Sequence, residues 1–203
     1  AYDVWTHTLI ALENAPADPV YRLTMLFHDS GKPAAHTVGE DGYDHFKEHP
    51  AISRDIAEAA LFAMKSDRAT MNRVLALITE HDLRIPAEPK SVRRQMARIG
   101  SDLFEALFPV FRADLLAQNP AMIPEKLRAE EALERVFREE VARNVCVKIS
   151  DLAVNGRDLM ALGITGPDVG RALKTLLDKV VSEELPNERE ALLAACQTRR
   201  PDA

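Results

Sequence analysis

Six side chains that can bind divalent metal ions are spread along this sequence, each on or beside a stretch of helical periodicity. They are four histidines and two aspartates: His7, His28, Asp29, His49, His81 and Asp114. Mixed sets of imidazole nitrogen and carboxylate oxygen accept several divalent metals. A single histidine on a helix is more often a surface or core residue, but this joint pattern uses four of the six histidines in the chain. The sequence therefore predicts a site for one or two divalent ions and does not distinguish Ni, Co, Mn, Fe, Zn or Mg.

The doublet His28-Asp29 lies at the centre of the predicted site. Successive residues of a helix point about 100° apart, so these two side chains are expected to flank an ion held beside the end of their helix. The expected ligands of a first ion are His7, His28, Asp29 and Asp114. His49 and His81 would complete a second site, with Asp29 bridging the two. Paired ions supply a hydroxide near neutral pH and hold a phosphoryl oxygen during in-line attack, so Asp29 is also a candidate catalytic residue.

Three more polar side chains near the doublet are candidates for contact with a substrate. Lys32 follows the doublet by three residues, and its ammonium group could meet a substrate phosphate, which makes it the second candidate catalytic residue. A solvated lysine at a helix end is the alternative. His45 is expected on nearly the same helix face as His49, four residues later, and His36 lies in a polar loop. Each of these two histidines is either a substrate contact or a solvated side chain.

The elements that must position these residues are predicted to be helices. Apolar residues recur at helical spacing almost throughout the chain. Aromatic residues make up only 5% of the sequence and alternating β-branched runs are almost absent, so strands are not expected. The fold class predicted is all-α, a helical bundle with a small helical C-terminal extension. The expected helices are about 2–14, 18–29, 45–65, 69–81, 91–98, 102–118, 124–146, 167–184 and 187–197, with a polar loop over 33–44.

The bulk properties of the chain restrict its function and location. Its 203 residues fit one large domain, or one domain with an extension, and its net charge of -6 argues against a domain devoted wholly to nucleic-acid backbones. Cys146 and Cys196 lack metal-type spacing and are expected to be reduced, packed thiols in a cytoplasmic protein. No apolar run has the length of a membrane span, so no membrane partner is expected. The chain starts at Ala1 without Met, and we expect it to be a fragment of a longer protein.

A basic stripe is predicted on the helix expected near 91–98. Lys90, Arg94 and Arg98 recur every four residues, with Arg93 beside them. On a helix these side chains share one face, which could lie along the phosphate backbone of an RNA. The alternative is a solvated face that forms ion pairs with nearby carboxylates. The charge pattern alone does not decide between these two interpretations.

Several segments of the chain resemble a known family. They are Leu26–Pro33, Asp44–Pro50, Arg112–Asn119, Asp151–Ile164 and Glu184–Glu188. The order of the histidines and aspartates resembles that of the HD-domain superfamily of metal-dependent phosphohydrolases. The segments themselves are similar to the HD domain and the C-terminal signature of bacterial tRNA nucleotidyltransferases, the CCA-adding enzymes. The resemblance covers essentially the whole chain and implies an HD phosphohydrolase domain at 1–147 and a helical tail at 148–203.

The sequence also departs from that family's pattern. The family's polymerase head needs an Asp-x-Asp pair to hold catalytic magnesium, and this chain contains none. The resemblance therefore implies a portion that lacks the head and cannot add nucleotides by itself. Glu48 stands where the family usually has Gly. All the ligand positions are filled, and the resemblance implies that an HD domain of this kind can hydrolyse 2′,3′-cyclic phosphates, 2′-nucleotides and simple phosphate esters.

Three functions are compatible with these features. The first is a metal-dependent phosphohydrolase of nucleotide phosphoesters that forms the HD and C-terminal part of a tRNA nucleotidyltransferase-like protein. The second is a tRNA-binding body module whose metal is structural, with tRNA as its partner. The third is a free-standing HD nucleotide hydrolase, for which the tail signature has no evident use. The oligomeric state is not predicted.

Overall fold

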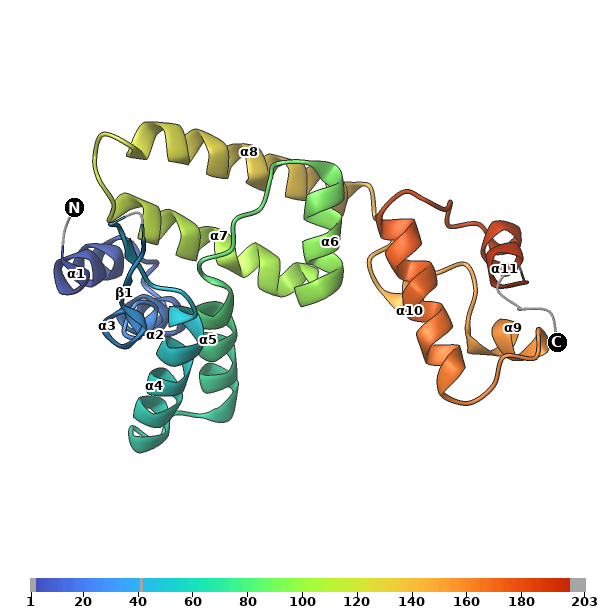
Figure 1. Ribbon diagram of the computed structural model, residues 1–203, viewed down its shortest axis with the longest axis horizontal. Coiled ribbons are helices and arrows are strands. Elements are labelled where there is room, and N and C mark those ends of the chain that lie inside the picture. The colour runs from blue at the N-terminus through green and yellow to red at the C-terminus, as the bar shows by residue number, and fades with distance from the viewer. Residues whose placement is uncertain (1–2, 41, 198–203) are drawn as a thin grey trace. The chain divides into compact units, whose positions relative to one another are not determined.

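The structure is a computed structural model that describes residues 3–40 and 42–197 (Figure 1). Its described residues form α-helices, one short two-stranded sheet and one 3-10 turn, which confirms the predicted all-α class. Backbone contacts divide the chain into two compact units, Ala1–Arg84 with Asp102–Ala132 and Ile85–Ser101 with Leu133–Ala203. This is a division of contacts, and the domain limits 1–147 and 148–203 stay a prediction. No helix in the described part of the chain is long and apolar enough to cross a membrane.

The first unit contains the helices that carry the predicted ligands. Helix α5 packs against α4 and α2, and α2 packs against α1. The strands β1 and β2 pair antiparallel, with Thr37 opposite His45 and Val38 opposite Asp44. In chain order the elements are α1 (Val4–Asn14), α2 (Pro19–Phe27), α3 (Lys32–Ala35), β1 (Thr37–Val38), β2 (Asp44–His45), α4 (His49–Ala63), α5 (Arg68–Glu80), α7 (Ser101–Leu116) and the first half of α8 (Ile123–Ala142).

Aspartate caps determine where three of these helices begin. The side chains of Asp3, Asp18 and Asp67 accept hydrogen bonds from backbone N–H groups in the first turns of α1, α2 and α5. Such caps satisfy N–H groups that have no partner within the helix. Pro19 follows Asp18 at the first helical position of α2, where its missing N–H has no cost.

One buried apolar cluster of the first unit lies between α4 and α5. Ala57 and Leu61 from α4 meet Val74, Leu75 and Ile78 from α5, and all five are buried. The spacing of these residues places them on one face of each helix. Packing of the two faces brings the first residue of α4 and the end of α5 into the same region.

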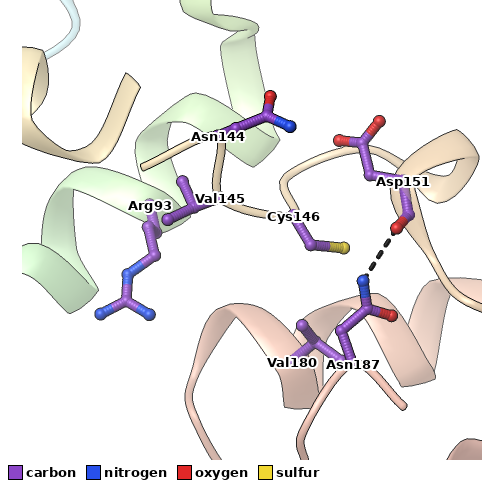
Figure 2. Close-up of a pocket in the computed structure, with 7 residues that line it drawn as sticks. All are labelled: Arg93, Asn144, Val145, Cys146, Asp151, Val180 and Asn187. Carbon is purple, nitrogen blue, oxygen red and sulfur yellow. Dashed lines mark hydrogen bonds between the residues drawn. The ribbon is translucent and has the colours of Figure 1, made fainter. Parts of the chain in front are cut away.

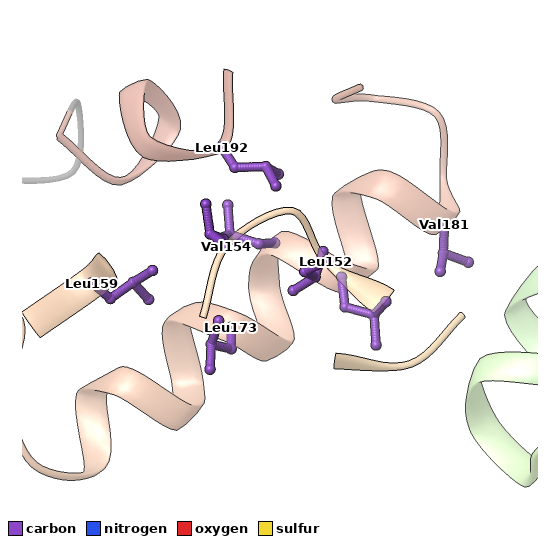
Figure 3. Packing of buried hydrophobic residues seen from close by; sticks show 8 residues of the cluster. Leu152, Val154, Leu159, Leu173, Val181 and Leu192 are labelled. Carbon is purple, nitrogen blue, oxygen red and sulfur yellow. The ribbon is translucent and has the colours of Figure 1, made fainter. Parts of the chain in front are cut away.

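The second unit has its own core, shown in Figure 3. Its elements are α6 (Pro89–Ile99), the second half of α8, η1 (Ile149–Asp151), α9 (Gly156–Ala161), α10 (Pro167–Val181) and α11 (Arg189–Gln197). The buried cluster comprises Leu152, Val154, Leu159, Leu173, Leu176, Leu177, Val181 and Leu192. Helix α10 supplies four of these residues and packs against α6 and α9.

Polar residues of the C-terminal signature, the segments Asp151–Ile164 and Glu184–Glu188, hold this second unit together. The Asn155 side chain accepts hydrogen bonds from the N–H groups of Arg157 and Asp158, and Asp158 accepts one from the Asn155 N–H. Asp158 also forms an ion pair with Arg189 of α11. The Asn187 amide donates to the Asp151 carbonyl and accepts from the Ala153 N–H. The signature residues therefore cap and cross-link the tail.

The observed elements differ from the predicted ones near the third helix. The segment 33–44, expected as a loop, contains α3 and one strand, and His45 lies in β2. Helix α4 begins only at His49, because Glu48 adopts a left-handed conformation with φ 66° that interrupts a helix. The expectation that His45 shares a helix face with His49 is therefore wrong. The predicted start of the first helix at residue 2 lies outside the described residues.

Candidate metal centre

The structure brings the six predicted ligand side chains together in the first unit. Five of them lie at or just beyond a helix end, and His7 is the fourth residue of α1. His28 and His81 are the C-terminal caps of α2 and α5, His49 is the first residue of α4, and Asp114 is in the last turn of α7. The ligand atoms form two groups, each lying within 4.8 Å of one another: His7, His28, Asp29 and Asp114, and Asp29, His49 and His81.

Asp29 belongs to both groups and turns one oxygen to each. Its Oδ2 lies 3.3 Å from the Nε2 atoms of both His7 and His28. Its Oδ1 lies 3.3 Å from Nε2 of His49 and 3.6 Å from Nε2 of His81. The carboxylate is only 1% exposed. Asp29 therefore lies between the two groups, and its role as a bridging ligand stays a prediction.

The four imidazole rings are all oriented in the same way, by hydrogen bonds from Nδ1 to backbone carbonyls. Nδ1 of His28, His49 and His81 lies 2.7, 2.8 and 2.7 Å from the carbonyl three residues earlier in the chain. Nδ1 of His7 lies 3.1 Å from the Ala117 carbonyl. A carbonyl can only accept, so each Nδ1 carries a proton, and each ring in its neutral form has its lone pair on Nε2.

These lone pairs converge. Nε2 of His7 and His28 are 3.2 Å apart, and Nε2 of His49 and His81 are 3.1 Å apart. Two nitrogen lone pairs at that distance, beside a buried carboxylate, repel one another unless a proton or a cation lies among them. Ligand histidines whose other nitrogen is held by a carbonyl are typical of metal sites. The nitrogen and oxygen donors of each group are of the kinds that bind divalent ions, so each group could hold one such ion.

The acid–base properties of the site reflect this crowding. Burial alone would lower the pKa of His28, but the carboxylates of Asp114 and Asp29 outweigh it and raise that pKa to about 9. Burial would raise the pKa of Asp29, but hydrogen bonds from His28, His49 and His81 hold it far below its usual range. His28 and His7 do the same for Asp114. In the metal-free protein the carboxylates are therefore ionised and attract positive charge.

Lys32 lies at the edge of the site. Its Nζ is 2.6 Å from Asp29 Oδ2, on the side of His7 and His28, and 5.9 Å from the centre of the Phe46 ring. All the ligands except the fully buried His28 line a pocket of about 470 Å³, together with Lys32, Phe46, Arg84, Gln118 and Asn119. His36, in contrast, is exposed and paired with Asp44 at 2.7 Å.

Gln118 was not among the predicted site residues, yet it contacts a predicted ligand. Its Nε2 donates a hydrogen bond to Asp114 Oδ2 at 2.7 Å. The signal that could have indicated it is the spacing of four residues, which brings side chains on a helix together. Phe46 and Arg84 gave no comparable signal, because only the pairing of distant segments places them beside the pocket.

The predicted basic stripe lies on α6, but its four residues have different surroundings. Arg93 is only 12% exposed and forms ion pairs with Glu140 at 2.9 Å and Glu183 at 2.7 Å. Arg94 donates a hydrogen bond to the Ser182 hydroxyl, and Arg98 donates one to Gln95. Lys90 is exposed at the start of the helix.

Two pockets of the second unit flank this helix. Arg94 and Arg98 join Lys148 and Lys174 around a pocket of about 760 Å³, in which Asp178 is the only carboxylate among the lining residues. The other pocket, of about 500 Å³, contains Cys146 and is shown in Figure 2, where the Asn187 amide bonds to the Asp151 backbone. Burial and the Asp151 charge raise the pKa of the Cys146 thiol to about 11, so it is a poor nucleophile.

Comparisons with known proteins agree on one family. Residues 57–196 match the family described as tRNA nucleotidyltransferase domain 2. The chain is 35% identical over 195 residues to a CC-adding tRNA nucleotidyltransferase of Thermus thermophilus, covering 92% of this chain and 43% of that protein. It is 29% identical over 199 residues to an A-adding tRNA nucleotidyltransferase of Deinococcus radiodurans, covering 93% of this chain and 45% of that protein. The chain thus spans less than half the length of these relatives. No solved structure gives a significant match.

Proposed function

The chain belongs to the tRNA nucleotidyltransferase family, and from this premise we propose that its first unit is an HD-type, metal-dependent phosphohydrolase of nucleotide phosphoesters. The observation that carries the proposal is the pair of ligand groups that share Asp29, in which every histidine turns Nε2 toward that carboxylate and Nδ1 toward a backbone carbonyl. A structural metal needs one closed ligand set, whereas two adjacent groups joined by one carboxylate suit phosphoester hydrolysis.

The residues of the chain have separate tasks in this proposal. His7, His28, Asp29 and Asp114 would hold one ion, and His49 and His81 would hold a second with Asp29. When bound, such ions lower the pKa of a water molecule and polarise a phosphoryl oxygen. Lys32 orients the substrate, because its ammonium lies at the pocket edge where a phosphate would approach. The backbone carbonyls that bond to the four imidazole rings keep the proton of each ring on Nδ1.

The test is hydrolysis of 2′,3′-cyclic AMP and bis-p-nitrophenyl phosphate by the purified chain with Ni²⁺, Co²⁺ or Mn²⁺. Asp29→Asn should abolish turnover, because it removes the charge shared by both groups. Asp55→Asn is the matched control, since Asp55 is an exposed aspartate on α4 that pairs with Arg54. If wild type shows no turnover, or if Asp29→Asn keeps it, the hydrolase proposal is wrong.

A second function, binding of tRNA by the second unit, is favoured by a specific observation. Four cations and one carboxylate surround the larger pocket of that unit, and its apolar lining residues include Ala97 and Leu177. Cations neutralise phosphates, and apolar surface accepts an unstacked base or ribose. The relatives are named as enzymes that add nucleotides to tRNA. We propose that Arg94, Arg98 and Lys174 contact the RNA.

The RNA proposal is tested by tRNA gel shifts over a series of salt concentrations. Lys174→Glu should weaken binding and reduce the slope of log K against log salt by about one. Lys179→Glu is the control, because Lys179 lies on the same helix and outside the pocket lining. Equal binding by both variants and wild type would contradict the proposal. Arg93 is unsuitable for this test, because its substitution would remove an ion-pair partner of the buried Glu140 and so destabilise the unit.

A further inference from the structure

We propose that Gln118 is a positioning residue for Asp114, held in place by Lys126, and that it controls the metal affinity of only one of the two ligand groups. The group concerned is His7, His28, Asp29 and Asp114. The inference rests on the proposed metal binding and adds a role for residues that bind no ion themselves.

The first step is the division of tasks between the two oxygens of Asp114. Oδ1 lies 2.9 Å from Nε2 of His7 and 3.4 Å from Nε2 of His28. Oδ2 accepts the hydrogen bond from the Gln118 amide at 2.7 Å. Rotation of the carboxylate would break this bond. Gln118 therefore keeps a single oxygen of Asp114 turned to the histidines.

The second step is the orientation of Gln118 itself. Its Oε1 accepts a hydrogen bond from Nζ of Lys126, on the first turn of α8. A lysine ammonium can only donate and an ionised carboxylate can only accept. The amide between them thus has one favourable orientation, with its oxygen toward Lys126 and its NH₂ toward Asp114. In the two hydrogen bonds from Lys126 to Gln118 and from Gln118 to Asp114, each donor and each acceptor is therefore fixed.

The third step is that Asp114 has more need of this support than Asp29 has. The Asp114 side chain is 24% exposed, whereas that of Asp29 is 1% exposed. Lys32 and the four histidines surround the buried Asp29 carboxylate, but a partly exposed carboxylate can rotate toward water. A directed hydrogen bond removes that freedom, which is the general effect of outer-shell partners on metal ligands.

The fourth step is the selectivity for one ligand group. The residue before Gln118 is Ala117, whose carbonyl accepts the bond from Nδ1 of His7. The turn after α7 therefore orients two of the four ligands in the first group. The rings of His49 and His81 rely instead on carbonyls three residues before them, at Phe46 and Ile78. A change in the turn should leave the second group intact.

The experiment is isothermal titration with Co²⁺ of chelator-treated protein, with the visible absorption of bound Co²⁺ as a second readout. Gln118→Met has nearly the same shape but no donor, and Lys126→Met removes the anchor without altering the turn. Loss of an outer-shell partner weakens metal affinity by about 10- to 100-fold. We expect Gln118→Met to fall in that range and Lys126→Met near its lower end. Arg128→Met is the control, because Arg128 is an exposed cation on the same helix.

The ligand group that depends on Gln118 is identified by Co²⁺ titration of Gln118→Met in two variants, each of which lacks one histidine ligand. In His49→Ala, which leaves the first group, Gln118→Met should still weaken Co²⁺ binding. In His7→Ala, which leaves the second group, it should have no effect. The inference is overturned if Gln118→Met and Lys126→Met both bind Co²⁺ as wild type does, or if binding weakens equally in both backgrounds. If wild type itself binds no Co²⁺, the proposed function fails as well, and the wild-type titration alone shows this.

Discussion

Any side chain at Gly31, two residues after Asp29, is predicted to destabilise the protein, because the backbone of α4 lies too close to leave room for a Cβ atom. The backbone conformation of Gly31 does not itself require glycine. Its φ of -82° is accessible to any residue. A Cβ atom at this position would, however, lie 2.6 Å from both the His49 carbonyl oxygen and the Ser53 nitrogen. The Gly31 N–H also donates to the Ser53 hydroxyl at 2.8 Å. The perturbation that tests this close approach is Gly31→Ala.

The magnitude follows from the distances. Ordinary contact with a Cβ begins at 3.4 Å, so the backbone of α4 would have to retreat by about 0.8 Å from its 2.6 Å separation. Overpacking of this kind costs about 1–3 kcal/mol, and we expect about 3 kcal/mol because a helix backbone cannot rotate away as a side chain can. His49 would move with α4, which would disturb its present separations of 3.3 Å from Asp29 and 3.1 Å from His81. A misplacement near 1 Å costs about 100-fold in activity.

One assay is urea unfolding of the chelator-treated protein, and the second is hydrolysis of bis-p-nitrophenyl phosphate by protein supplied with Co²⁺. Gly170→Ala is the matched control, because a Cβ at Gly170 in α10 meets no atom within 4 Å. That substitution should raise the free energy of unfolding by about 0.5–1 kcal/mol. If Gly31→Ala proves as stable as wild type and as active, the close approach of α4 does not constrain the site and the reasoning is refuted.

Three other predictions concern single side chains. Glu48→Gly should raise the free energy of unfolding by about 0.5–1 kcal/mol, because a left-handed residue costs about 1–2 kcal/mol and glycine loses about 0.5–1 kcal/mol in entropy; a Glu48→Ala variant that gains as much would contradict this in urea unfolding. In the metal-free protein the pKa of His28 is about 9 against an ordinary 6.5, so its proton stabilises the fold fully below pH 6.5. The free energy of unfolding should fall by up to about 3 kcal/mol as pH rises through 9, and His28→Gln should lack this fall; equal pH profiles would count against the assignment. Cys146, whose pKa is raised to about 11, should react with iodoacetamide at pH 8 far more slowly than a free thiol. Mass spectrometry of Cys196→Ser follows this site alone, and rapid labelling would show that the thiol is more accessible than its burial implies.

The chemistry of the candidate site could be predicted because it depends on residue type and local spacing. His28, His49 and His81 each use a carbonyl three residues earlier, so their ring orientation is set within a single turn of the chain. The tail signature is local too, since Asn155 and Asp158 cap each other across three residues. The all-α class follows from apolar periodicity. Each of these features depends on neighbours that the sequence itself places nearby.

Tertiary structure alone decided the features that join distant segments. The ring of His7 is held by Ala117, and Arg93 is paired with Glu140 and Glu183, residues that no spacing rule connects. Likewise, the strand at His45 and the late start of α4 depend on pairing with β1 and on the backbone turn at Glu48. The sequence by itself determined which atoms could bind a metal and that helices would carry them. Only packing decided which oxygen of Asp29 faces which histidines, because that choice depends on the relative positions of four helices.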